Sequence, residues 1–137
     1  MKSDSLVIIP TYNEKENIRN IITAVLNVNE HQFDVLVVDD NSPDGTAAIV
    51  ESIIADQPER IHILKRPGKQ GLGTAYIAGF KWALDHPYEY IIEMDADFSH
   101  PVNKLPELQA ACATGGAHVY VVSRYLTGGN VVNWPMG

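Results

Sequence analysis

Two aspartates separated by one residue give the strongest chemical signal in this sequence. Asp95 and Asp97 follow directly after an apolar run that ends near Met94. In extended backbone, residues two apart point the same way, so the two carboxylates would share one face with the small Ala96 between them. Hard oxygen ligands that leave coordination positions open suit Mg²⁺ or Mn²⁺ bridging the phosphates of a nucleotide. Such a triplet is weak alone and becomes more specific after a buried strand.

A second group of acids follows an earlier apolar run. Asp39 and Asp40 precede a Pro43-Asp44-Gly45 turn, and either Ser42 or Asp44 can begin the next helix. An acid at the end of the second parallel strand commonly accepts hydrogen bonds from a ribose or a base edge. Solvated loop acids explain the same residues equally well, so both interpretations stay open here.

The first apolar run is followed by Pro10-Thr11-Tyr12-Asn13-Glu14. We expect Asn13 to cap the next helix and Glu16, three residues on, to complete a capping box. Capping does not explain the presence of Pro10, Tyr12 and Glu14.

The glycine-rich stretch between residues 68 and 75 resembles a phosphate-binding loop but matches neither standard template. A Rossmann fingerprint would follow the first strand and needs a glycine where Tyr76 stands, and a P-loop needs Gly-Lys-Ser/Thr after four spacer residues. Two interpretations remain. Either the loop brings backbone close to a ligand while Arg66 or Lys69 supplies positive charge, or it is a plain connection.

The elements that must position these residues follow from hydrophobic periodicity. Short, mostly β-branched runs predict strands buried on both faces, and stretches with helical periodicity lie between them. This alternation predicts an α/β, Rossmann-like, mostly parallel sheet with helices on both faces, and ligands in such sheets bind beyond the carboxyl ends of the strands. The expected strands are Leu6–Ile9, Val35–Val38, Ile61–Leu64, Tyr90–Met94 and Val119–Val122, and the expected helices lie at about 18–26, 47–54, 72–84 and 103–113.

Composition limits the class of protein. The 137 residues support one domain, and ten Lys plus Arg against seventeen Asp plus Glu give a net charge of −7, which argues against a general nucleic-acid binder. The single cysteine, Cys112, excludes an internal disulfide and fits a reducing compartment. No apolar run approaches the roughly 18 residues that a membrane span needs.

Several of these motifs together resemble the dolichol-phosphate (polyprenol-phosphate) mannosyltransferase family, which belongs to the inverting glycosyltransferases of family 2 with the GT-A fold. The resemblance covers nearly the whole chain in the expected order. It rests on the stretches Val7–Glu14, Val37–Thr46, Gly71–Tyr76, Met94–Asp97 and Ser123–Tyr125.

The resemblance implies transfer of mannose from GDP-mannose to a polyprenyl or dolichyl phosphate, with inversion and a divalent ion, Mg²⁺ or Mn²⁺. It assigns nucleotide binding to Pro10, Tyr12, Glu14, Val38, Asp40, Asp95, Ala96 and Asp97. The implied metal ligands are Asp95, Asp97 and Ser99, although the family often has Gln at the last position. Arg124 would face the phosphates, so the implied catalytic residues are Asp95, Asp97 and Arg124.

Related catalytic domains are longer, so residues 1–137 are expected to be the amino-terminal, nucleotide-sugar-binding part of a single catalytic domain. On this interpretation Val131, Val132 and Trp134 lack their packing partner. The full-length protein is expected to be cytoplasmic and to lie at the cytoplasmic face of the membrane, which its carboxyl-terminal part would contact.

Three alternatives remain at this stage. The chain could be a nucleotide-binding fragment without transfer activity, or a family 2 transferase that uses UDP-glucose or another nucleotide sugar. It could also be a nicotinamide-dependent oxidoreductase, but the expected glycine fingerprint is missing after Ile9.

Overall fold

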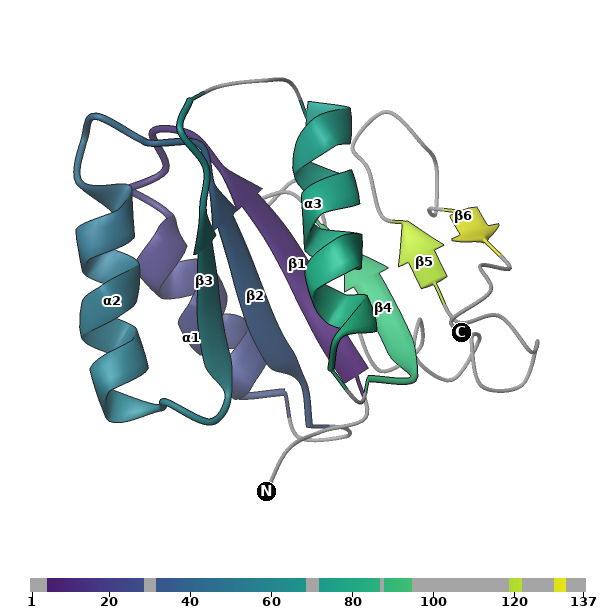
Figure 1. Ribbon diagram of the computed structural model, residues 1–137. Helices are drawn as coiled ribbons and strands as arrows, with labels where there is room; N and C mark the ends of the chain where they lie inside the picture. The colour runs from purple at the N-terminus through teal and green to yellow at the C-terminus, as the bar shows by residue number, and fades with distance from the viewer. Residues whose placement is uncertain are drawn as a thin grey trace.

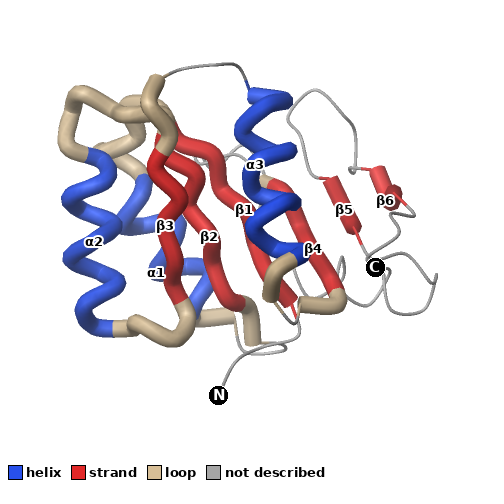
Figure 2. Tube along the Cα trace, in the orientation of Figure 1, coloured by secondary structure: helices blue, strands red, loops and turns tan. Residues whose placement is uncertain are grey.

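The computed structural model describes residues 5–28, 32–68, 72–86, 88–94, 119–121 and 130–132, and places side chains as far as Met94. These residues alternate between strands and helices as the sequence predicts, and Figures 1 and 2 show a twisted sheet with helices on either side. The expected helix near 103–113 lies outside the described residues. The elements are β1 (Ser5–Thr11), α1 (Ile18–Leu26), β2 (Asp34–Asp39), α2 (Thr46–Asp56), β3 (Ile61–Lys65), α3 (Leu72–Leu84), β4 (Tyr90–Glu93), β5 (Val119–Val121) and β6 (Asn130–Val132).

The sheet has the strand order β3-β2-β1-β4-β5-β6. Strands β1 to β5 pair in parallel, which confirms the expected mostly parallel sheet. Strand β6 was not predicted and runs antiparallel to β5, with Val131 opposite Tyr120 and Val132 opposite Val119. Val131 and Val132 thus have a backbone partner in β5, whereas the expectation that they lack a packing partner concerns side chains that lie outside the described part of the structure, as does Trp134.

Each face of the sheet has its own hydrophobic core. Alternate strand residues such as Val7 and Val37 pack against α1 and α2, whereas Ile8 and Val38 point to the opposite face and pack under α3. This arrangement, with α3 alone in front of the strands in Figure 1, explains why the strand sequences are apolar without alternation. In the part of the chain that the structure describes, no helix has the length and apolarity needed to cross a membrane.

The start of α1 differs from the sequence prediction. The helix begins at Ile18, the residue before it is Asn17, and no side chain caps it. Asn13 instead adopts a left-handed backbone with φ 58°, and Glu16 is exposed. The predicted capping box was wrong because the backbone N–H groups near Asn13 bind side chains from a different loop, as described below.

Helix α3 lies close against β1 at Gly79. A Cβ atom at this position would lie 2.8 Å from Ile8 Cγ2 and 3.5 Å from Val38 Cγ2. Both neighbours are fully buried in the sheet, and Ile8 is β-branched, so neither can move aside at low cost. The absence of a side chain at residue 79 therefore sets the distance between α3 and the sheet.

We expect Gly79→Ala to destabilise the protein by about 1–3 kcal/mol, because overpacking outweighs the higher helix propensity of alanine. Equilibrium unfolding in urea measures this change. Gly68→Ala is the matched control, since a Cβ at Gly68 meets no atom within 4 Å. Equal stability of the two variants would show that α3 can move away from β1 without penalty.

Candidate functional site

The order of the strands reverses direction between β1 and β4. The chain moves outward from β1 to β2 and β3, then returns to the other side of β1 with β4, and ligands bind at such reversals in parallel sheets. The N–H of Met94 donates to the carbonyl of Ile8 at 3.0 Å. The next residue of β1 whose backbone faces β4 is Pro10, which has no N–H to donate.

Asp39, the last residue of β2, is a buried carboxylate that joins β1 to the loop after β2. It is only 1% exposed and lies opposite Thr11 in the sheet. Its Oδ1 accepts hydrogen bonds from Thr11 Oγ1 at 2.7 Å and from Ser42 Oγ at 2.6 Å, and its Oδ2 accepts one from the Ser42 N–H at 3.0 Å. These three donors compensate for the cost of burying the charge.

The loops after β1 and β2 are joined by what we call the loop junction. It consists of three successive N–H groups, those of residues 13 to 15, bound by three side chains of the other loop. Ser42 Oγ accepts from residue 13 at 2.9 Å, Thr46 Oγ1 from residue 14 at 3.0 Å, and Asp44 Oδ2 from residue 15 at 3.1 Å. Backbone donors that would otherwise need water are thus bound within the protein.

The Asp44 carboxylate accepts hydrogen bonds from the loop after β1 and from the start of α2. Its Oδ1 accepts from the N–H of Thr46, the first residue of α2, at 3.0 Å. The N-cap position itself is occupied by Gly45 without a side-chain cap, so the prediction that Ser42 or Asp44 begins this helix was wrong, although Asp44 binds its first N–H. Its Oδ2 binds Lys15 in the loop after β1. Burial by itself raises the pKa of Asp44, but hydrogen bonds from Thr46 and Lys15 and the Lys15 charge lower the pKa below its ordinary value of 3.8.

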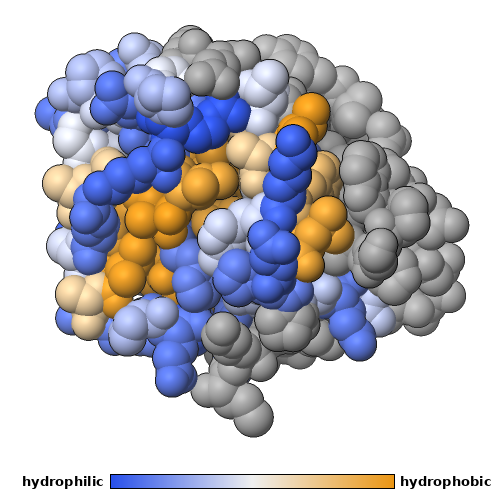
Figure 3. Space-filling view, viewed as in Figure 1, coloured by the Kyte–Doolittle hydropathy of each residue, from blue (hydrophilic) through white to orange (hydrophobic). Residues whose placement is uncertain are grey.

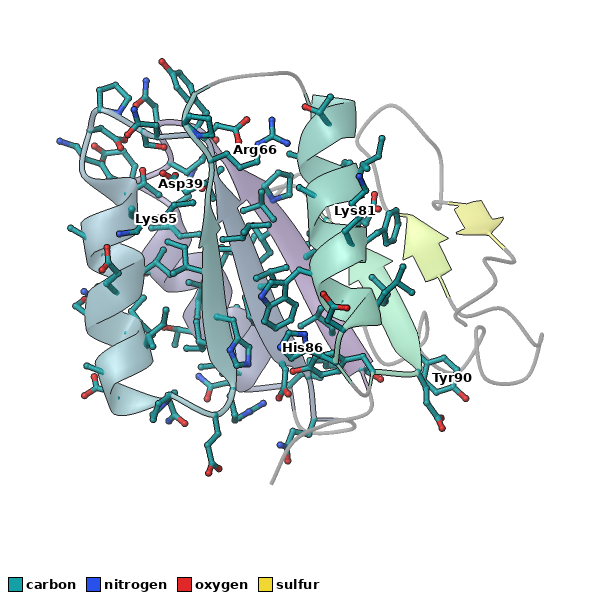
Figure 4. All side chains as sticks on the ribbon, in the orientation of Figure 1. Asp39, Lys65, Arg66, Lys81, His86 and Tyr90 are labelled. Carbon is teal, nitrogen blue, oxygen red and sulfur yellow. The ribbon has the colours of Figure 1, made fainter. Side chains whose placement is uncertain are left out.

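Asp40, the next residue, forms a separate pair with Arg66. Arg66 Nε lies 2.7 Å from Asp40 Oδ1, and its Nη2 lies 3.5 Å from Oδ2, so the guanidinium faces both carboxylate oxygens. Both side chains are at most 9% exposed. Figure 4 shows Arg66 beside Asp39 at the carboxyl end of the strands, the end where the predicted ligand-binding residues gather and where Figure 3 shows hydrophilic surface.

Glu93, the last residue of β4, is a buried acid that the sequence analysis did not single out. It is 2% exposed, and its Oε1 has no hydrogen-bond partner among the described residues. Burial raises its pKa to about 8, because desolvation disfavours the ionised form. Desolvation thus favours the neutral form of Glu93 at the end of β4.

Four of the predicted nucleotide-binding residues lie at this edge of the sheet. Pro10 has no N–H to offer toward β4, Tyr12 is 38% exposed, the N–H of Glu14 belongs to the loop junction, and Asp40 is paired with Arg66. Val38 lies one residue before Asp39 with its side chain fully buried under α3, so only its backbone could contact a ligand. The remaining predicted site residues, Asp95, Ala96, Asp97, Ser99 and Arg124, lie outside the described residues.

Within the described ranges, no cluster of three His, Cys, Asp or Glu side chains could bind a metal ion. The metal ligands predicted from sequence therefore stay a prediction. The sequence analysis also missed the pairing of Arg66 with Asp40. It treated Arg66 only as a source of positive charge. The available signal was the position of Arg66, the first residue after β3, at the same sheet edge as Asp40.

Comparison with known proteins agrees with this geometry. A family model described as glycosyl transferase family 2 matches residues 6–137. The chain belongs to glycosyl transferase family 2. This assignment leaves the nicotinamide-dependent oxidoreductase alternative without support, in line with the missing glycine fingerprint.

Two curated relatives share 47% sequence identity with the chain. One is a polyprenol monophosphomannose synthase of Mycolicibacterium smegmatis, matched over 96% of this chain and 49% of its own length. The other is an undecaprenyl-phosphate mannosyltransferase of Micrococcus luteus, matched over 95% and 52%. The chain thus spans about half the length of these relatives.

The fold also matches solved glycosyltransferases. The mannosyltransferase PcManGT of Pyrobaculum calidifontis, solved in complex with GDP-Man and Mn²⁺, superimposes with a TM-score of 0.67. The alignment covers 82% of this chain and 33% of PcManGT at 23% identity, so it supports the GT-A fold alone.

The lowered pKa of Asp44 predicts a pH-dependent contribution to stability. Because the folded-state pKa is below the ordinary 3.8, ionised Asp44 stabilises the fold above this value and the contribution is lost as the pH falls through the lowered pKa. Asp44→Asn should lower the melting temperature at neutral pH, and the difference from wild type should narrow toward about pH 3. Thermal unfolding across this range measures the effect.

Asp56→Asn is the control for this prediction, since Asp56 is an exposed residue at the other end of α2. Its melting temperature should follow wild type at every pH. A constant difference between Asp44→Asn and wild type from neutral to acid pH would mean that the carboxylate charge does not stabilise the loop junction.

Proposed function

We propose that this chain is the nucleotide-sugar-binding part of an inverting glycosyltransferase that transfers mannose from GDP-mannose to a polyprenyl or dolichyl phosphate. The membership of glycosyl transferase family 2 and the names of the two relatives support the class of reaction and the acceptor. The complex of PcManGT with GDP-Man and Mn²⁺ is consistent with the donor and with a divalent metal.

The observation that carries the proposal is the set of rigid polar loops at one end of the sheet. The loop junction fixes the backbone of Glu14 next to the β2–α2 loop, Tyr12 precedes it by two residues in the same loop, and Asp40 lies one residue beyond β2. Strand β4 ends beside them, and in sequence it leads directly into Asp95. A nucleoside would bind against the loops and its diphosphate would extend toward the end of β4.

The donor set fits a divalent metal. Asp95, Asp97 and Ser99 supply two carboxylates and one hydroxyl, all hard oxygen ligands of the kind that Mg²⁺ and Mn²⁺ prefer. When bound, the metal would neutralise the diphosphate of the leaving nucleotide. The two Asp residues and Ser99 would bind it from the segment directly after β4, and Ala96 would keep the space between the carboxylates small.

The reaction needs little proton transfer. An anionic oxygen of the acceptor phosphate attacks the anomeric carbon, and the bond from this carbon to the diphosphate oxygen breaks with inversion. The electron pair of that bond leaves with GDP. Because the attacking oxygen is already negative at neutral pH, a strong general base is unnecessary, and Arg124 would instead neutralise charge on the phosphates and help to orient them.

The acceptor is a lipid, so the whole protein would act at the cytoplasmic face of a membrane. Attachment to the membrane surface through the lipid acceptor is the proposed arrangement. The segment around Arg124 would approach the lipid phosphate, and further contacts would come from parts of the domain beyond those that the relatives share with this chain.

We expect GDP to stabilise the chain against heat, and to do so more strongly with Mn²⁺ than with EDTA. A ligand present at a hundredfold excess over its dissociation constant adds about 2.7 kcal/mol of stability. Thermal unfolding with GDP, UDP and each metal condition measures this. Asp97→Ala should remove the metal-dependent part of the GDP shift while retaining the fold.

Asp56→Ala is the matched control, because it removes an exposed carboxylate at the opposite end of the sheet from the proposed site. It should behave as wild type. A GDP shift that is the same with Mn²⁺ and EDTA would contradict the metal site, and a larger shift with UDP than with GDP would contradict the proposed donor.

A further inference from the structure

Arg66 joins three elements at the proposed nucleoside site. Its N–H donates to the Asp39 carbonyl at 2.8 Å, which attaches the end of β3 to the end of β2. Its guanidinium faces both oxygens of Asp40 through Nε and Nη2. The same Nη2 donates to Thr74 Oγ1 at 2.9 Å, and Thr74 lies in the first turn of α3.

These contacts restrict the Asp40 carboxylate. A planar guanidinium in a close ion pair approaches a carboxylate from a fixed direction and restricts its orientation, which a lysine ammonium does not do. The pair is nearly buried, with exposed fractions of 9% for Arg66 and 7% for Asp40, so water competes little with the contact. Thr74 in turn limits the rotation of the guanidinium.

We propose that Arg66 and Thr74 are positioning residues that determine the preference of this site for guanine, by orienting the Asp40 carboxylate. The inference rests on the proposed function, in which Asp40 contacts the nucleoside of GDP-mannose. Neither Arg66 nor Thr74 needs to touch the nucleotide. Their effect is to fix the direction in which the remaining lone pairs of Asp40 point.

The chemistry of guanine explains why direction matters. Its Watson–Crick edge carries two adjacent donors, the ring N1–H and the exocyclic 2-amino group. Asp40 Oδ1 is fully buried beside Arg66 Nε, so Oδ2 is the oxygen that could accept from this edge, and the orientation of the carboxylate decides which donor it meets. Hypoxanthine lacks the 2-amino group and offers a single donor on this side. The preference for GDP over IDP therefore reports how well Asp40 is oriented.

A purely structural role for the pair predicts a different result. Loss of a structural contact would lower the melting temperature and weaken the binding of GDP and IDP equally, because both nucleotides share the ribose and the diphosphate. Loss of the Asp40 orientation would weaken the binding of GDP more than that of IDP. The ratio of the two dissociation constants thus separates the two roles, even where a variant is somewhat less stable.

The test measures the dissociation constants of GDP and IDP by calorimetry for the full 137-residue chain and four variants. Arg66→Met and Thr74→Val remove the contacts, Arg66→Lys keeps the charge without the planar fork, and Thr74→Ser keeps the hydroxyl. Lys65→Met is the charge-matched control, since Lys65 pairs only with exposed Glu51 among the contacts described for it.

We expect wild type to prefer GDP by about tenfold or more, and Arg66→Met and Arg66→Lys to lose most of this preference. Thr74→Val should reduce the logarithm of the GDP-to-IDP affinity ratio by about half. Thr74→Ser and Lys65→Met should retain the wild-type ratio. If Arg66→Met does not fold, Thr74→Val against Thr74→Ser decides the question at an exposed position.

The outcomes separate this inference from the proposed function. If wild type binds neither nucleotide, the proposed function fails and the inference fails with it. If wild type binds GDP and the ratio of GDP to IDP affinity is the same in wild type and in the Arg66 and Thr74 variants, only the inference is overturned. A wild type that binds GDP and IDP equally also overturns only the inference.

Discussion

The buried carboxylate of Asp39 is the interaction on which the geometry of this edge of the sheet depends. An ionised group at 1% exposure is stable only if donors surround it, and the three that do so come from β1 and from the loop after β2. Ser42, fixed by Asp39, is then in position to accept from the N–H of Asn13. Asp39 thus holds the first acceptor of the loop junction, Ser42, in place, and the other two acceptors are Thr46 and Asp44.

A rigid pair of loops suits a site that must bind an extended nucleotide without large rearrangement. The left-handed backbones of Asn13 and Asn41, with φ 58° and 56°, are conformations that asparagine tolerates better than most residues. These conformations allow both loops to turn sharply. The N–H groups of residues 13 to 15 still donate to acceptors within the protein. The entropy cost of ordering these loops is already included in the free energy of folding. Less of this cost therefore remains to weaken ligand binding.

The sequence was sufficient for the elements and insufficient for the contacts between them. Runs such as Val35–Val38 predicted strands because burial on both faces removes polar residues, and β2 extends this run by one residue at each end. Asn13 was misassigned because a local capping pattern competed with a hydrogen bond to Ser42, 29 residues away. The pairing of Arg66 with Asp40 depends on the register of β2 against β3, which periodicity does not reveal. Strand β6 has three residues, too few for a period to show.

The missing donor at Pro10 has a consequence that involves no side-chain contact. In a parallel pair, every second residue of a strand directs both its N–H and its carbonyl toward the same neighbour, and at position 10 the β1 backbone can accept a hydrogen bond but cannot donate one. Any other residue at position 10 would present an N–H toward β4. The carboxyl end of the sheet, where ligands of parallel sheets bind, therefore has one backbone donor fewer because of the ring of a single residue.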